Sequence, residues 1–154
     1  METSTPRTPD PDDHASPRAT RLPARPDAVS RARRAVRRAA TTAGMAEDRV
    51  DDLVLAVSEA CTNAMEAHVA SGATEAIEVT CERVGAMFEV RVRDRGGGFR
   101  LEHLAPRPPL ADPRHLEVER GWGVQLMQHL VDEVTFDLTE PGTCVCLRNA
   151  LAPS

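Results

Sequence analysis

The chain has 154 residues, of which 41% are hydrophobic and 3% aromatic, so length and composition predict one domain with an aliphatic core. Its net charge of -5 argues against a general role in binding nucleic acid or membrane surfaces. All 19 basic residues are Arg, and the lack of Lys excludes the P-loop and the eukaryotic-type kinase site, which both need a Lys beside the phosphates.

The N-terminal segment has no structural signal of its own. Residues 1–18 are rich in Pro, Thr, Asp and Ser, so we expect a disordered tail followed by one domain over residues 19–151. No apolar run approaches the roughly 20 residues of a membrane helix. The first 17 residues also lack the hydrophobic centre of a signal peptide, so we expect a cytoplasmic protein without a membrane segment.

The first half of the domain predicts an edge strand and two helices. The strand covers 19–24 and ends at two prolines, and the first helix covers 27–43 and ends at Gly44. This helix carries arginines on its polar face, which are either solvated or an acidic-partner docking surface. The second helix covers 47–70, and Glu59 and Asn63 lie one turn apart opposite its apolar stripe.

The second half predicts an antiparallel sheet interrupted by a loop and a helix. Strands are expected over 76–82 and 87–94 as a hairpin, the latter burying Phe88, Val90 and Val92. Four prolines within 100–119 indicate a loop of the kind that forms a lid. A helix over 121–132 and strands over 134–138 and 143–148 follow. The total is an α+β fold with four or five mainly antiparallel strands and helices on one face.

Three polar and glycine motifs stand in a fixed order along these elements. They are Glu59-x-x-x-Asn63, Asp94-x-Gly96-x-Gly98 and Gly121-x-Gly123. Each alone has a plain interpretation, as a solvated helix face, a hairpin exit and a tight turn before a helix. The ordered set resembles the nucleotide site of the GHKL ATPase superfamily, which makes ATP the expected ligand.

The motifs near the sheet suit the adenine ring. Asp94 stands at the end of a strand, where its carboxylate can accept a hydrogen bond from the exocyclic amino group. Gly96 and Gly98 have no Cβ, so the backbone there can approach a flat ring closely.

The helix motifs suit the phosphates. Gly121 and Gly123 stand at a helix start, where free N–H groups and the helix dipole favour a polyphosphate. Asn63 can give a neutral oxygen to Mg²⁺. Glu59, one turn away, can act as the general base on an attacking hydroxyl.

A closer resemblance covers residues 22–151. The stretches Leu55–Ala64, Val92–Phe99, Arg120–Met127 and Gly142–Leu147 are similar to those of the RsbW and SpoIIAB group of anti-sigma factors. The resemblance implies a Bergerat (GHKL) two-layer sandwich with serine-protein kinase activity. It also implies binding of a sigma factor, phosphorylation of a Ser on a STAS-type anti-anti-sigma protein, and a homodimer.

The same resemblance assigns roles to residues. Glu59 is then the general base, Asn63 the Mg²⁺ ligand and Asp94 the adenine acceptor with Gly96 and Gly98 beside it. Gly121, Gly123 and Arg120 meet the phosphates, and Thr143 supports Asp94 from the last strand. One departure is that Ala67 stands where the family usually has His, and His68 follows one residue later.

Other interpretations stay open. A histidine kinase is disfavoured, because no two-helix segment with a phosphoacceptor His precedes the domain. A catalytically weak ATP-binding partner-switch or scaffold module needs only Asp94 and the glycines. A nucleotide-independent structural protein is the third possibility. The four cysteines match no zinc or CxxC pattern, so we expect buried reduced thiols.

Overall fold

The computed structural model describes residues 18–96, 119–137 and 142–151. It contains one five-stranded sheet in the order β1-β2-β3-β5-β4, and every neighbouring pair is antiparallel. The elements are β1 (Arg18–Leu22), the short 3-10 helix η2 (Pro26–Ala28), α1 (Val29–Thr42), α2 (Glu47–Ser71), β2 (Ile77–Val84), β3 (Met87–Arg93), α3 (Glu119–Leu130), β4 (Glu133–Asp137) and β5 (Cys144–Ala150). The expected α+β architecture is confirmed.

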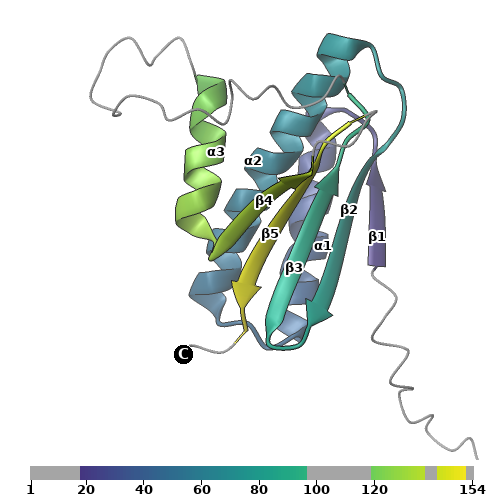
Figure 1. The fold of residues 1–154 in the computed structure, drawn as a ribbon. Helices are drawn as coiled ribbons and strands as arrows, with labels where there is room; N and C mark the ends of the chain where they lie inside the picture. Colours follow the sequence, from purple (N-terminus) through teal and green to yellow (C-terminus); the bar gives the residue numbers. More distant parts are fainter. Residues whose placement is uncertain (1–17, 97–118, 138–141, 152–154) are drawn as a thin grey trace, which may run out of the picture.

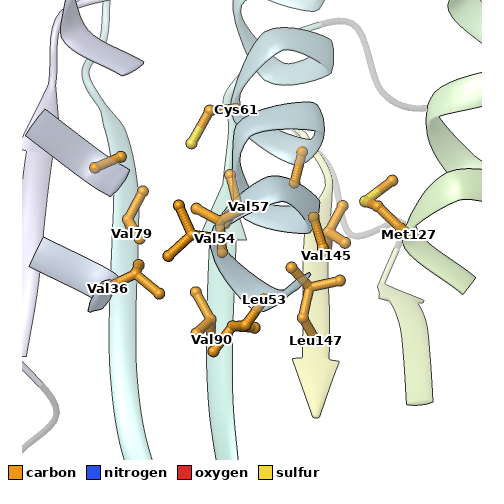
Figure 2. Packing of buried hydrophobic residues seen from close by; sticks show 14 of the residues in the cluster. Val36, Leu53, Val54, Val57, Cys61, Val79, Val90, Met127, Val145 and Leu147 are labelled. Atoms are coloured by element: carbon orange, nitrogen blue, oxygen red, sulfur yellow. The ribbon is translucent and has the colours of Figure 1, made fainter. Parts of the chain in front are cut away.

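The three α-helices cover one face of the sheet, with α2 between α1 and α3 (Figure 1). The core between the two layers is aliphatic, as the low aromatic content predicts. Figure 2 shows it with side chains from every layer, among them Val36 of α1, Leu53, Val54, Val57 and Cys61 of α2, Met127 of α3, and Val79, Val90, Val145 and Leu147 of the strands. Because α2 is central, its position relative to the sheet is fixed along its length.

The sequence of α2 sets both ends of the helix. Glu47 and Asp48 lie in its first turn, where carboxylates stabilise the positive end of the helix dipole. Gly72 follows its last residue with φ 72°, a left-handed conformation that a glycine adopts without strain. The predicted span is confirmed to within one residue. The structure therefore places Glu59 and Asn63 in the middle and second half of a 25-residue helix.

Several predicted boundaries differ by one or two residues. The last helix begins at Glu119 rather than Gly121, and it ends at Leu130. The hairpin strand β2 extends to Val84, so the tight turn lies at residues 85–86, where Gly85 has φ 60°. Cross-strand pairing with β3 favours this extension, and single-strand periodicity does not contain that information.

One charged residue of β3 is buried. Alternation along β3 places Glu89 on the face of the sheet away from the helices, yet its residue exposure is 4%. Its carboxylate lies 2.6 Å from Arg148 Nε on β5 and 3.2 Å from Arg91 Nη2. The arginines cover the carboxylate from the neighbouring positions. Periodicity within one strand cannot predict such cross-strand partners.

The cysteines are less uniform than predicted. All four are free thiols, but only Cys61 and Cys146 are buried, while Cys81 and Cys144 are partly exposed. Burial raises the pKa of Cys61 to about 12 and that of Cys81 to about 11, so both stay protonated and unreactive at neutral pH. Within the described parts of the chain, no group of three or more His, Cys, Asp or Glu residues is arranged to hold a metal ion.

Asp132 joins the helical layer to the last strand. Its Oδ2 accepts hydrogen bonds from Arg49 Nη2 at 2.7 Å and from the Ala150 N–H at 2.8 Å. Its own N–H donates to Asn149 Oδ1 at 2.7 Å. The Ala150 N–H has the largest effect and lowers the pKa of Asp132; burial opposes it, and the Arg49 guanidinium lowers the pKa further. One side chain thus connects the start of α2, the end of α3 and the end of β5.

We predict that Asp132→Ala lowers the free energy of unfolding by about 1 kcal/mol at pH 7, a value kept small because solvent screens this exposed ion pair. Since the folded pKa lies below the unfolded one, the contribution is full above the unfolded value of about 3.9 and is lost as pH falls through the folded value. Urea unfolding of wild type and Asp132→Ala at pH 7 and at a pH below the folded pKa of Asp132 measures the difference. An equal difference at both pH values would contradict this account.

Candidate nucleotide site

Three polar side chains lie on one face of α2. Glu59, Asn63 and Glu66 follow each other at four and three residues, which stacks them along the helix. All three are half-buried, whereas Ala60, Cys61 and Ala64 face the core. The sequence predicted the first two of these residues and missed the third.

Glu59 has the electrostatics of a base. Burial raises the pKa of its carboxyl, and the negative charge of Glu66 raises it further. A higher pKa makes a carboxylate a stronger proton acceptor, which suits general-base catalysis at neutral pH. Sequence reasoning missed Glu66 because it lies outside the motif, although its spacing from Asn63 places it on the same face.

Asn63 has an unused hydrogen-bonding group. Its Nδ2 is buried and has no hydrogen-bond partner within the described part of the chain. An amide can rotate to exchange its nitrogen and oxygen, so the same position can present Oδ1 to a ligand. This orphaned amide, with the carboxylates of Glu59 and Glu66 on either side, offers the oxygen donors that Mg²⁺ prefers. The residues present therefore fit the predicted metal.

Asp94 directly follows β3 and is 5% exposed. Its Oδ1 accepts the Gly96 N–H at 3.0 Å, and its own N–H donates to the Thr143 carbonyl at 2.9 Å. Burial raises the pKa of Asp94, while hydrogen bonds from the backbone of Gly96 and Thr143 act in the opposite direction. The structure thus holds a buried carboxylate between the predicted neighbours Gly96 and Thr143.

Two glycines bring backbones close together beside Asp94. A Cβ on Gly96 would lie 2.7 Å from the Ala67 carbonyl carbon and 2.8 Å from the Ala67 Cβ, so the turn after Asp94 touches the end of α2. A Cβ on Gly142 would overlap the carbonyl oxygen of Asp94. Sequence reasoning placed Gly142 in a turn and in the family stretch Gly142–Leu147 but predicted no contact for it, because no local pattern shows which strand a glycine will face.

Ala67 and His68 lie where the sequence departs from the family pattern. Small Ala67 is the residue in contact with Gly96, and His68 is 1% exposed. His68 Nε2 accepts the backbone N–H of Arg95 at 2.8 Å. Sequence reasoning noted the shift of this His but assigned it no role.

The residues predicted to meet the phosphates are only partly within the described chain. Gly121 lies in the first turn of α3 after Arg120, whereas Gly123 is the fifth residue of the helix and lies past that turn, because the helix begins two residues earlier than predicted. Gly98 and nearly all of the predicted lid at 100–119 lie outside the described residues. Figure 1 shows the end of α2, the end of β3 and the start of α3 at the same end of the molecule. The topology therefore brings Asp94, Gly96 and the start of α3 to the end of the domain where α2 ends, and Glu59 and Asn63 lie roughly two to three turns before that end of the helix.

Comparison with known proteins agrees with this arrangement. The model of the histidine kinase-like ATPase domain family matches residues 22–149. The serine-protein kinase RsbW of Bacillus licheniformis is 35% identical over 117 residues, which are 73% of this chain and 72% of that protein. The chain belongs to the histidine kinase-like ATPase domain family. RsbW of Bacillus subtilis is 32% identical over 118 residues, covering 74% of this chain and 73% of its own length.

Solved structures support the fold. The structure of the RsbU and RsbW domains of Rv1364c from Mycobacterium tuberculosis matches 88% of this chain with a TM-score of 0.64 and 23% identity. This chain covers 32% of that longer one. The SiaB–SiaC complex from Pseudomonas aeruginosa gives a TM-score of 0.58 at 16% identity over 86% of this chain and 87% of the solved chain. The expected family and the GHKL-type fold are confirmed, and the chain is an RsbW-type member.

Proposed function

We propose that this protein is an ATP-dependent serine-protein kinase and anti-sigma factor, which binds Mg-ATP and phosphorylates a Ser of a STAS-type anti-anti-sigma protein. The observation that carries the proposal is the contact between α2 and the turn after β3. It joins the helix with Glu59 and Asn63 to the buried carboxylate of Asp94. An adenine acceptor and a base are thereby parts of one rigid unit.

Each residue has one task in this proposal. Asp94 accepts a hydrogen bond from the exocyclic amino group of adenine, and Gly96 lets the turn after Asp94 pack directly against Ala67 of α2. Asn63 holds Mg²⁺, which when bound neutralises phosphate charge. Glu59 takes the proton from the attacking Ser hydroxyl as its oxygen bonds to the γ-phosphorus and ADP leaves. Gly121, Gly123 and Arg120 face the phosphates, and Thr143 fixes the strand beside Asp94.

The proposed partners follow from the family. A sigma factor is held away from RNA polymerase, and phosphorylation of the STAS protein prevents the exchange of partners. This reaction takes place in the cytoplasm, needs no direct contact with nucleic acid and is compatible with a homodimer. Separately, none of the helices in the described ranges is long and apolar enough to cross a membrane.

The proposal is tested by titrating Mg-ATP while following the fluorescence of Trp122, the single Trp of the chain. Wild-type protein should give a saturable change. We predict that Asn63→Ala weakens the Mg²⁺-dependent affinity at least about tenfold, because a metal ligand is lost. Affinity for ATP without Mg²⁺ should change little, because Asp94 and the glycines are intact.

Thr62→Ala is the matched control. Thr62 is exposed on the same helix, and its hydroxyl only donates to the Ser58 carbonyl of the preceding turn. It should bind Mg-ATP like wild type. A wild-type protein that shows no saturable change in fluorescence, and no heat of binding by calorimetry, would overturn the proposal.

A further inference from the structure

The backbone N–H groups of the turn after β3 have three different partners. That of Asp94 donates to the Thr143 carbonyl at 2.9 Å, and that of Gly96 donates to the Asp94 carboxylate at 3.0 Å. That of Arg95, between them, donates to His68 Nε2 at 2.8 Å. Among these three partners, the imidazole is the one side chain that comes from another element.

Direct packing strengthens this connection. Ala67, the neighbour of His68, lies so close to Gly96 that a Cβ added to the glycine would be 2.7 Å from the carbonyl carbon of Ala67. Consecutive residues of α2 thus contact consecutive residues of the turn, one by packing and one by a hydrogen bond. The position of Asp94 relative to the helix that carries Glu59 and Asn63 depends on this pair of contacts.

The bond fixes the chemical form of His68. A nitrogen that accepts a hydrogen bond has no proton, so the neutral ring carries its proton on Nδ1. That Nδ1 is buried and has no hydrogen-bond partner within the described part of the chain. A buried donor without a partner is destabilising. An apolar side chain of similar volume would avoid that penalty but would leave the Arg95 N–H without its acceptor, so the use of the histidine at this position is the bond to the turn.

We propose that His68 is a positioning residue of the nucleotide site, which through its Nε2 acceptor holds the Asp94–Gly96 turn in the conformation that receives adenine. The inference rests on the proposed function, because it concerns the affinity of the same site. His68 does not touch the nucleotide. It acts through the Arg95 amide, and its loss leaves Asp94 present but free to move.

The decisive experiment compares two substitutions. In His68→Gln the side-chain carbonyl oxygen takes the place of Nε2 and keeps the acceptor, whereas His68→Leu keeps the volume and removes it. His129→Leu is the matched control, because His129 is an exposed histidine in the last turn of α3. The readouts are the dissociation constant for Mg-ATP, the hydrogen exchange rate of the Arg95 amide and the melting temperature.

We expect His68→Leu to raise the dissociation constant at least tenfold and to speed exchange of the Arg95 amide. His68→Gln should stay within about threefold of wild type, consistent with a rescued hydrogen bond, and His129→Leu should match wild type. Wild-type affinity in folded His68→Leu would overturn the inference. So would equal weakening in His68→Gln and His68→Leu at unchanged melting temperature, because the acceptor would then not matter.

Two further outcomes are also decisive. If His68→Leu does not fold, His68→Gln alone decides: a protected Arg95 amide with wild-type affinity supports the inference, and an unprotected amide with wild-type affinity overturns it. If wild-type protein itself binds no Mg-ATP, the proposed function fails and this inference falls with it. That result differs visibly from a loss confined to the His68 variants.

Discussion

Glu59→Gln should lower the rate of phosphoryl transfer by about 10² to 10⁴, the usual contribution of a general base. The substitution keeps the size of the side chain and removes its ability to take a proton. Affinity for Mg-ATP should change little, because Asn63 and Asp94 remain. Single-turnover transfer of labelled phosphate to a purified STAS protein measures the rate, and calorimetry measures the binding.

Glu66→Gln gives a second test of the role of the Glu59 carboxylate. The charge of Glu66 raises the pKa of Glu59, after the larger effect of burial. Removing that charge should lower the pKa of Glu59, so the acid limb of the pH–rate profile should move to lower pH. A base with a lower pKa is weaker, so the plateau rate should also fall slightly.

These variants also separate a kinase from a scaffold. A catalytically weak binding module would show little transfer in wild type and no loss in Glu59→Gln, while partner capture would remain in both. If Glu59→Gln transfers phosphate at the wild-type rate, Glu59 is not the base. Glu66, on the same face of α2, would be the next carboxylate to test.

The fold was predictable because its signals are local. The spacing of apolar residues fixes α2, Gly72 ends it, and the alternation of Phe88, Val90 and Val92 identifies the buried face of β3. The family motifs then supply the order of the site residues. Each of these features can be read from neighbouring positions in the sequence.

The missing parts of the site depend on contacts between distant segments. Gly142 faces the Asp94 carbonyl across the sheet, and His68 meets Arg95 across 27 positions of sequence. The burial of Glu89 likewise requires Arg148 from another strand. No periodicity within one element contains these pairings, so only the assembled structure shows them.

Asp94→Asn should weaken ATP binding on the order of 10²-fold, the expected loss for a hydrogen bond to a charged acceptor. Asn can still accept the Gly96 N–H through its oxygen, so the turn is kept. Its other group is then an NH₂, which faces the exocyclic amino group of adenine as a second donor. Asp137→Asn, at an exposed position of β4, is the matched control and should bind normally.

The same variant should not be less stable without nucleotide. Burial raises the pKa of Asp94 above its unfolded value. A raised carboxyl pKa means that ionisation destabilises the fold, an effect absent below the unfolded pKa and complete above the folded one. Neutral Asn avoids that penalty, so its melting temperature at pH 7 should equal or exceed that of wild type.

The affinity of wild-type protein for ATP should also depend on the titration of Asp94. Ionisation of this carboxyl lowers stability but should raise the affinity. Ionised Asp94 accepts the adenine amino group, so binding should weaken as pH falls through its raised pKa, at a higher pH than for an ordinary Asp. Asp94→Asn should lack this dependence. A variant that melts well below wild type at pH 7 would show instead that Asp94 is mainly structural. If Asp94→Asn is more stable than wild type but no longer binds ATP, the buried charge of Asp94 serves ligand binding and not the stability of the fold.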